Sequence, residues 1–80
     1  MPPVTNFKRL DVRELIRRGS QPLPEIQQRA DKIQPGEGLI IIAPFLPSPL
    51  IELLGGQGFR SKLERGSGAD WVVYFWREMA

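Results

Sequence analysis

Alternating side chains mark the first element of the chain, between residues 7 and 13. In an extended strand, successive side chains point to opposite faces, so every second residue shares a face. One face then carries Lys8, Leu10 and Val12, and the other carries Arg9, Asp11 and Arg13. We expect a half-buried strand here, followed by a polar connection that includes Arg17, Arg18 and Gly19.

A helical pattern follows this connection. Apolar residues recur at spacings of three and four, which places on one helical stripe Leu23, Ile26, Ala30 and Ile33. Pro22 and Pro24 fit the first turn, because the first N–H groups of a helix have no partner within it. We expect Ser20 or Gln21 to cap the helix, and the turn Gln34–Gly36 to end it.

The run Leu39–Ala43 is apolar and rich in β-branched residues, which predicts a central strand. Ser48 as a cap and Pro49 at the first helical position predict a second, shorter helix. The pair Gly55–Gly56 would end that helix.

Two further strands, over residues 59–64 and 71–76, are separated by the turn Gly66–Gly68 and would form a hairpin. The predicted order is therefore βαβαββ. Because a crossover between parallel strands is right-handed, the first two strands would be parallel, with both helices on one face. The pattern predicts an α+β fold, a two-layer α/β sandwich.

Composition limits this fold to one small domain. Eighty residues, of which 41% are hydrophobic and 25% charged, match one soluble globular domain over residues 1–80, with an ordered core at about 7–77. The chain contains no apolar stretch near the roughly 20 residues that cross a bilayer. Residues 1–8 do not resemble a signal peptide, so we expect a cytoplasmic location and no membrane partner.

The chain contains neither cysteine nor histidine. This excludes thiol nucleophiles, zinc sites built from these residues and imidazole acid–base chemistry. Two acidic pairs remain, Asp11 with Glu14 and Glu64 with Asp70, and neither has a fixed geometry or a neighbouring nucleophile. We therefore expect no enzyme, no cofactor and no metal.

Several short motifs, in their order and spacing, resemble the TusA/SirA-like sulfur-carrier family across nearly the whole chain. The motifs are Leu10–Arg13, Pro22-Leu23-Pro24 and Pro35-Gly36-Glu37. The later stretches Pro47–Leu50 and Gly58-Phe59 are more similar to an uncharacterised side branch, a domain of unknown function. The resemblance implies a four-stranded mixed sheet in the order 1-2-4-3, with two helices packed on one side.

The same resemblance implies that sulfur chemistry is lost. In the sulfur carriers a cysteine stands immediately before the first of the two helix-opening prolines, and this chain has Gln21 at that place. A carboxamide cannot carry a persulfide, because that chemistry needs a thiolate. In the side branch, the loop before the second helix often carries histidine and aspartate, and here it carries Phe45 and Leu46.

The first candidate surface is the edge where both helices would begin. Ligands of open α/β sheets bind beyond the carboxyl ends of parallel strands, near helix N-termini. This candidate binding edge comprises Arg13, Arg17, Arg18, Gln21, Pro22, Phe45 and Leu46. The alternative is that the arginines are solvated loop residues and that Phe45 belongs to the core.

The second candidate surface is the sheet face that no helix covers. Strand 71–76 carries Trp71, Val73 and Phe75 on one side and Val72, Tyr74 and Trp76 on the other, so one set should be left outside. The candidate patch comprises Arg60, Lys62, Tyr74 and Trp76, with Arg9 and Arg13 as further basic residues beside it. The alternative is that the patch forms a homodimer seam or is covered by the termini.

These observations favour a non-catalytic binding or adaptor module. Its partner would be another protein, an acidic segment or a small anion. A single-stranded RNA-binding module is the second hypothesis, because aromatic rings with basic neighbours stack on bases. The net charge of +2 is only a weak bias toward such a partner. A carboxylate- or cofactor-dependent enzyme is a remote third.

Overall fold

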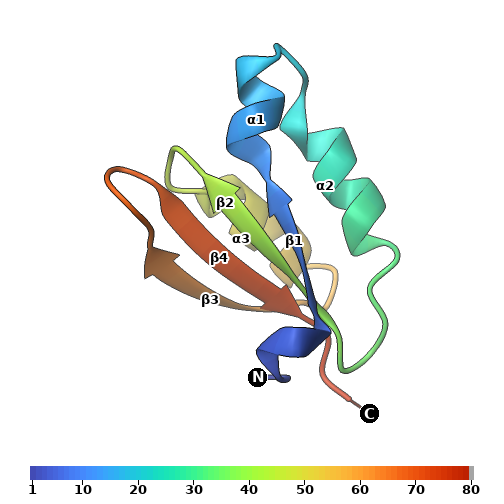
Figure 1. Cartoon of the computed structure of the whole chain (residues 1–80). Helices are drawn as coiled ribbons and strands as arrows, with labels where there is room; N and C mark the ends of the chain where they lie inside the picture. The colour runs from blue at the N-terminus through green and yellow to red at the C-terminus, as the bar shows by residue number, and fades with distance from the viewer. Residues whose placement is uncertain (80) are drawn as a thin grey trace.

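Four strands form one mixed sheet in the computed structural model, which describes residues 1–79 (Figure 1). The strands are β1 (Phe7–Asp11), β2 (Gly38–Ala43), β3 (Arg60–Arg65) and β4 (Trp71–Trp76). Their spatial order is β1-β2-β4-β3, with β1 and β2 parallel and the other neighbours antiparallel. The predicted strand order and α+β class are confirmed.

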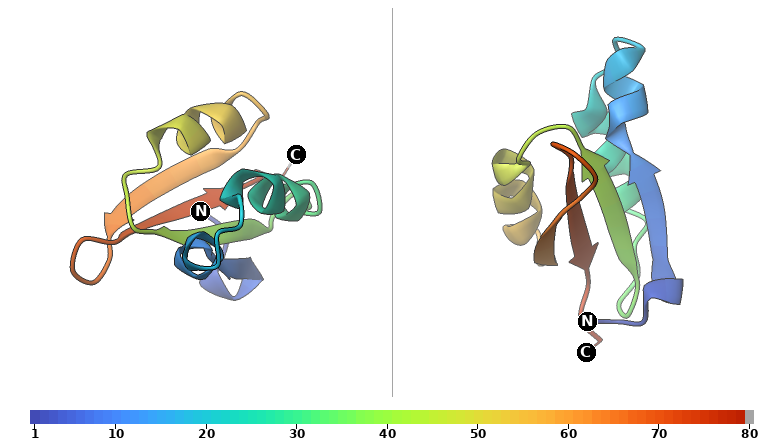
Figure 2. Two further views of the ribbon diagram at one scale, coloured as in Figure 1. Left: turned by 90° about the horizontal axis from the view of Figure 1, so that it is seen from above. Right: turned by 60° about the vertical axis from the view of Figure 1, so that its left-hand side comes forward.

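Two helices, α2 (Pro22–Ala30) and α3 (Ser48–Gly55), pack on the same face of the sheet (Figure 2). Their buried residues share one core with the inward side chains of β2 and β4. The helices contribute Ile26, Ala30, Leu50 and Leu54, and the strands contribute Leu39, Ile41, Val73 and Phe75. Phe59 packs edge-on against Phe75, with ring centroids 6.4 Å apart. The core therefore lies between one sheet face and these two helices.

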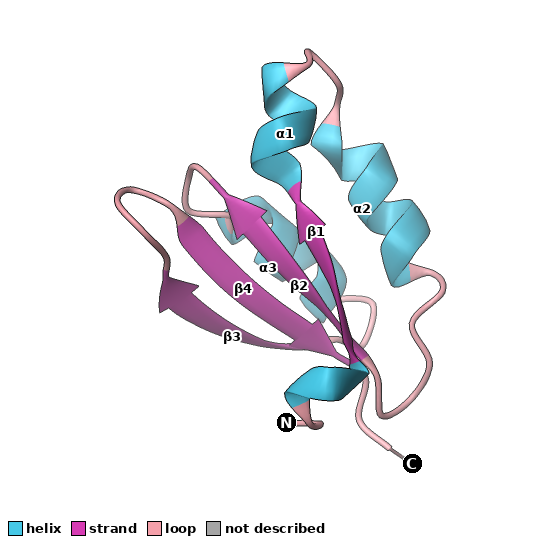
Figure 3. Cartoon of the chain, in the orientation of Figure 1, coloured by secondary structure: helices cyan, strands magenta, loops and turns pink. Residues whose placement is uncertain are grey.

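The chain also forms a helix that the sequence pattern did not predict, α1 (Val12–Arg17), directly after β1 (Figure 3). The predicted strand 7–13 is thus two residues too long, and the predicted polar connection is mostly helical. Asp11 explains the change, because its Oδ1 accepts a hydrogen bond from the backbone N–H of Arg13 at 3.0 Å and caps the helix. Val12 is buried in this helix, as it would also be in the predicted strand.

Other helix boundaries differ by a few residues from the expected ones. Helix α2 ends at Ala30, yet Ile33 is still buried, because the backbone continues in turns. Gln21 takes the cap position of α2 without a side-chain hydrogen bond, and Pro47 rather than Ser48 takes that of α3. Neither cap residue makes a side-chain hydrogen bond, and a proline with its fixed φ stands in the first turn of each helix, Pro22 in α2 and Pro49 in α3.

The two ends of the described chain lie together, at the end of the sheet away from α1 (Figure 1). A single 3-10 turn, η1 (Val4–Asn6), precedes β1. After β4, Arg77 extends the strand pairing, because the backbone N–H of Gly36 donates to its carbonyl at 2.8 Å. Within residues 1–79, none of the helices is long and apolar enough to cross a membrane.

Candidate functional site

A pocket of about 160 Å³ opens where β1 and β2 end and where α2 and α3 begin. We call it the helix-start pocket. All of its lining residues are apolar: Val12, Pro22, Leu23, Ile26, Ile41, Ala43, Phe45, Pro47, Pro49 and Leu50. The predicted edge therefore contains a cavity, and of its predicted residues the cavity includes Pro22 and Phe45.

The walls of this pocket differ in exposure. Its floor is formed by Val12, Ile41 and Ala43, all of which are buried. Its rim contains Leu23 and Phe45, whose side chains are each 48% exposed. Leu23 therefore does not complete the core stripe of α2, and Phe45 does not fold into the core as the alternative interpretation required.

The first turns of both helices are poor in hydrogen-bond donors. Anions bind at helix N-termini through unpaired backbone N–H groups. Pro22, Pro24 and Pro49 occupy positions in these turns and carry no N–H. With apolar side chains around them, the two helix starts favour an apolar group over an anion.

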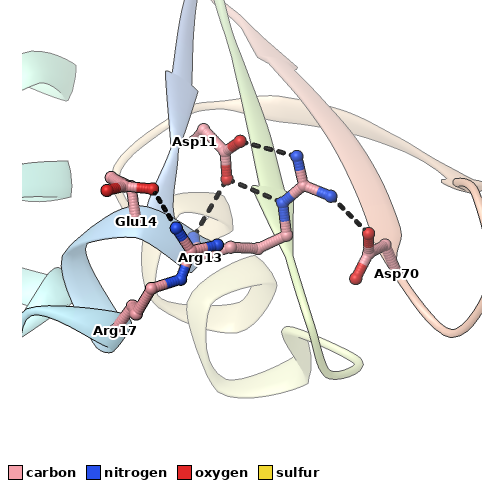
Figure 4. Close-up of polar contacts among 5 residues, drawn as sticks. All are labelled: Asp11, Arg13, Glu14, Arg17 and Asp70. Atoms are coloured by element: carbon pink, nitrogen blue, oxygen red, sulfur yellow. Dashed lines mark hydrogen bonds and ion pairs between the residues drawn. The ribbon is translucent and has the colours of Figure 1, made fainter.

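The predicted arginines of the edge are not gathered around the pocket. Arg13 is held by two carboxylates (Figure 4): it donates to Asp11 from Nε at 2.9 Å and from Nη2 at 2.6 Å, and to Asp70 from Nη1 at 2.5 Å. Arg17, on α1, pairs with Glu14 at 2.7 Å. The pocket at this edge is therefore apolar, and neither Arg13 nor Arg17 lines it.

The remaining predicted edge residues do not line the pocket. Arg18 follows α1 and is exposed, and Gln21 is exposed at the start of α2. Leu46 follows Phe45 in the loop after β2 and is 46% exposed. The pocket itself was missed, because its shape depends on how two helix starts meet, which no local pattern encodes.

The sheet face opposite the helices, here called the open sheet face, is ordered in rows across the strands. Cross-strand pairing gives a first row of Phe7, Gly38, Trp76 and Arg60. A second row, the basic row, contains Arg9, Ile40, Tyr74 and Lys62. A third, the acidic row, contains Asp11, Ile42, Val72 and Glu64. Val72 and Tyr74 are half-buried on this face, as the alternation predicted.

Trp76 departs from the predicted patch, because it is only 8% exposed. The ring of Phe7 packs edge-on against both Trp76 and Tyr74, with centroid distances of 6.5 and 5.8 Å. Gly38 lies between Phe7 and Trp76 in the first row and provides the space, since a Cβ at Gly38 would clash with the Phe7 ring. The Phe7 ring therefore covers Trp76 in the first row, and the sequence pattern did not reveal that Phe7 belongs to this face.

Acidic partners accompany the basic residues of this face. Arg60 Nε lies 3.4 Å from Glu78, and Lys62 Nζ lies 3.4 Å from Glu64. Between Arg9 and Tyr74 a shallow depression of about 250 Å³ has Ile40, Ile42 and Val72 as its floor. The open sheet face is therefore an apolar strip with charges of both signs along its sides.

The residues of the two predicted acidic pairs lie beside basic side chains. The hydrogen bond from the Arg13 side chain lowers the pKa of Asp11 from its ordinary value of 3.8, whereas a general acid at neutral pH needs a raised pKa. Glu14, Glu64 and Asp70 are each engaged by a cation. Within residues 1–79, no group of three acidic side chains is placed to hold a metal ion.

Comparison with known proteins gives a family without an assigned activity. No curated protein and no solved structure matches the chain. A family model described as an uncharacterized conserved protein, DUF2249, matches residues 9–77, from β1 to the residue after β4. Because this match spans most of the chain, the chain belongs to the DUF2249 family of uncharacterised conserved proteins.

Proposed function

We propose that this protein is a non-catalytic binding module whose helix-start pocket receives one apolar side chain of another protein. The observation that carries the proposal is a cavity of about 160 Å³ in which every lining residue is apolar. An apolar cavity of about 150 Å³ in another protein stays dry and binds benzene, so this volume suits one aromatic or aliphatic side chain.

The surroundings of the pocket favour a protein over a free small molecule. Phe45, Leu23 and Leu46 are all close to half exposed, so apolar surface continues outside the cavity. Apolar residues around an anchoring pocket are typical of protein interfaces, where they exclude water around the anchor. A pocket of this volume is also smaller than the roughly 300–1,000 Å³ of typical cofactor and drug sites.

The relation to TusA/SirA-like proteins belongs to this proposal. The strand order β1-β2-β4-β3 and a helix that begins at Pro22 support it. Gln21 stands at the helix-start edge, at the place that the sulfur-carrier cysteine would take. We infer that this chain binds at the same edge without the sulfur relay, since it contains no thiol.

Single-stranded RNA binding is less well supported than it was by the sequence. Stacking needs an accessible ring, and Trp76 is buried, with its Nε1 donating to Glu78 at 3.1 Å. The two basic residues of the predicted patch, Arg60 and Lys62, lie next to carboxylates. A small anion at the edge is likewise disfavoured by the prolines of the helix starts.

An amide NMR titration tests the pocket directly. The probes are N-acetyl-phenylalaninamide and, as a polar control, N-acetyl-aspartamide, both at millimolar concentration because a single side chain binds weakly. We expect the aromatic probe to shift the amide signals of Leu23, Ile26 and Leu50, and the polar probe to leave them in place.

A matched pair of variants completes this test. Phe45→Ala removes a rim residue, whereas Leu46→Ala removes a neighbour of similar exposure that does not line the pocket. We expect Phe45→Ala to abolish the shifts and Leu46→Ala to retain them. Equal shifts with both probes, or equal loss in both variants, would contradict the proposal.

A further inference from the structure

We propose that a second copy of this chain covers the open sheet face, in a dimer whose two-fold axis lies between the facing sheets and runs across their strands. This surface is independent of the helix-start pocket. Ile40 and Ile42 of β2 face the open side, whereas Ile41 and Ala43 of the same strand face the pocket.

Charge complementarity within the face carries the inference. The basic row ends in Arg9 on β1 and Lys62 on β3, and the adjacent acidic row ends in Asp11 and Glu64 on the same two strands. The middle positions of both rows are apolar: Ile40 and Tyr74 in the first, Ile42 and Val72 in the second. Opposite charges thus occupy matching positions one row apart.

A two-fold axis can place the basic row of one copy opposite the acidic row of the other copy. A two-fold axis that runs across the strands, midway between these rows, places each strand over the same strand of the second copy and exchanges the two rows. Lys62 then faces Glu64 of the second copy. Arg9 faces Asp11 of the second copy, whose carboxylate is also bound by Arg13 of its own chain, so the pair on β3 contributes most of the complementarity. In the centre, half-buried Tyr74 faces Val72 of the second copy, and half-buried Ile40 faces Ile42 of the second copy, which is only 5% exposed and contributes little surface.

The other face-to-face arrangement is unfavourable. A two-fold axis parallel to the strands places each row over the same row of the second copy. Lys62 would then face Arg9 of the second copy, and like charges opposite one another repel. Facing sheets pack with strand directions within about 30° of each other, an angle at which the favourable pairs still meet.

The size of the patch predicts a weak, reversible dimer. Strands spaced about 4.8 Å apart, with about 3.3 Å per residue, give four strands of this length roughly 400 Å² of flat sheet per copy. Interfaces below about 1,200 Å² in total belong to weak and transient complexes. Association is therefore expected in the micromolar-to-millimolar range.

Charge swaps on β3 test both the dimer and its register. Lys62→Glu would place glutamate against Glu64 of the second copy, and Glu64→Lys would place lysine against Lys62 of the second copy. We expect each variant, alone, to lower the association constant about tenfold or more, because two symmetric contacts turn repulsive. Sedimentation velocity over a concentration series measures the effect.

A mixture of the two variants gives the decisive result. In a heterodimer of Lys62→Glu with Glu64→Lys, every facing pair regains opposite charges, so we expect association within about threefold of wild type. The mixture cannot restore the internal Lys62–Glu64 pair of either chain, so recovery reports on the interface alone. The double variant K62E/E64K should also recover.

Arg17→Glu is the control, because it breaks an exposed ion pair on α1 with the same change of charge and should leave the dimer intact. A wild-type chain that stays monomeric up to millimolar concentration would overturn the proposal. So would a 1:1 mixture that associates no more tightly than the single variants. Neither result bears on the pocket, which the NMR titration addresses separately.

Discussion

Arg13 at the start of α1 and Asp70 before β4 are 57 positions apart in the sequence, yet Nη1 of the arginine donates to Oδ2 of the aspartate at 2.5 Å. The same guanidinium is bound on its other side by Asp11. One side chain thereby joins the end of β1, the first turn of α1 and the turn that leads into β4. An arginine held in this way is not available to an anionic ligand.

This cluster should make stability depend on acid pH. The pKa of Asp11 in the folded protein lies below 3.8, chiefly because of the side-chain hydrogen bond from Arg13. Its contribution is therefore present above that ordinary value and is lost as the pH falls through the lower folded-state pKa. We expect the free energy of unfolding to fall more steeply between pH 5 and pH 2 in wild type than in Asp11→Asn.

Denaturant unfolding at several pH values measures this difference. Asparagine at position 11 still caps α1, so the variant removes the charge while retaining the cap. In an Arg13→Gln background, Asp11→Asn should change the slope much less. Identical slopes for wild type and Asp11→Asn would show that Asp11 is not stabilised in its charged form.

Filling the helix-start pocket should stabilise the protein. Ala43→Val adds two methyl groups toward a cavity that Ala43 lines, and burial of each carbon is worth about 0.8 kcal/mol. We expect a gain of about 1 kcal/mol in the free energy of unfolding, together with weaker shifts from the aromatic probe.

Ala30→Val is the matched control for this substitution. Ala30 is also fully buried, but it lies on α2 away from the pocket, so the added carbons have no cavity to enter. We expect a loss of about 1–3 kcal/mol from overpacking. If both substitutions destabilised the protein equally, the cavity would not be present in solution.

Arg77 should be important for stability although it lies beyond the last strand. Its guanidinium stacks 4.2 Å from the Phe59 ring centroid, and its Nε donates to the carbonyl of Ile33 at 3.1 Å. We expect Arg77→Met to cost about 1–2 kcal/mol, measured by thermal or denaturant unfolding. Arg77→Lys should recover only part of this, because an ammonium cannot reproduce the planar stack. Full recovery by lysine would contradict the role of the ring.

Gly38 should not tolerate a side chain. A Cβ there would lie 2.6 Å from the carbonyl oxygen of Phe75 and would clash with the Phe7 ring. We expect Gly38→Ala to destabilise the protein by about 1–3 kcal/mol. Gly55→Ala is the comparison, since nothing lies near its Cβ position, and it should be close to neutral or slightly stabilising. Equal effects at both glycines would argue against close packing of Phe7.

The sheet could be predicted because its elements follow local patterns. The predicted strand over residues 71–76 coincides with β4, and the apolar run of β2 was short by Gly38 only. Helix α1 was missed because Val12 is buried in a strand and in a helix alike. The capping aspartate at position 11, with an acid and a base in the next turns, was the signal that could have revealed it.

The candidate sites were harder to predict, because they depend on contacts between distant segments. The pairing of Arg13 with Asp70 and the covering of Trp76 by Phe7 join residues from opposite ends of the chain. The helix-start pocket likewise depends on the distance between two helix starts. Residue types at this edge suggested a basic site, and only the fold showed that its cavity is apolar.

The alternation of side chains along β2 has a consequence for how such a protein can diversify. Ile41 and Ala43 belong to the pocket, and Ile40 and Ile42 belong to the opposite face. Because neighbouring residues of one strand face opposite sides, substitutions at Ile41 or Ala43 can change which group the pocket accepts while the side chains of the open sheet face stay the same.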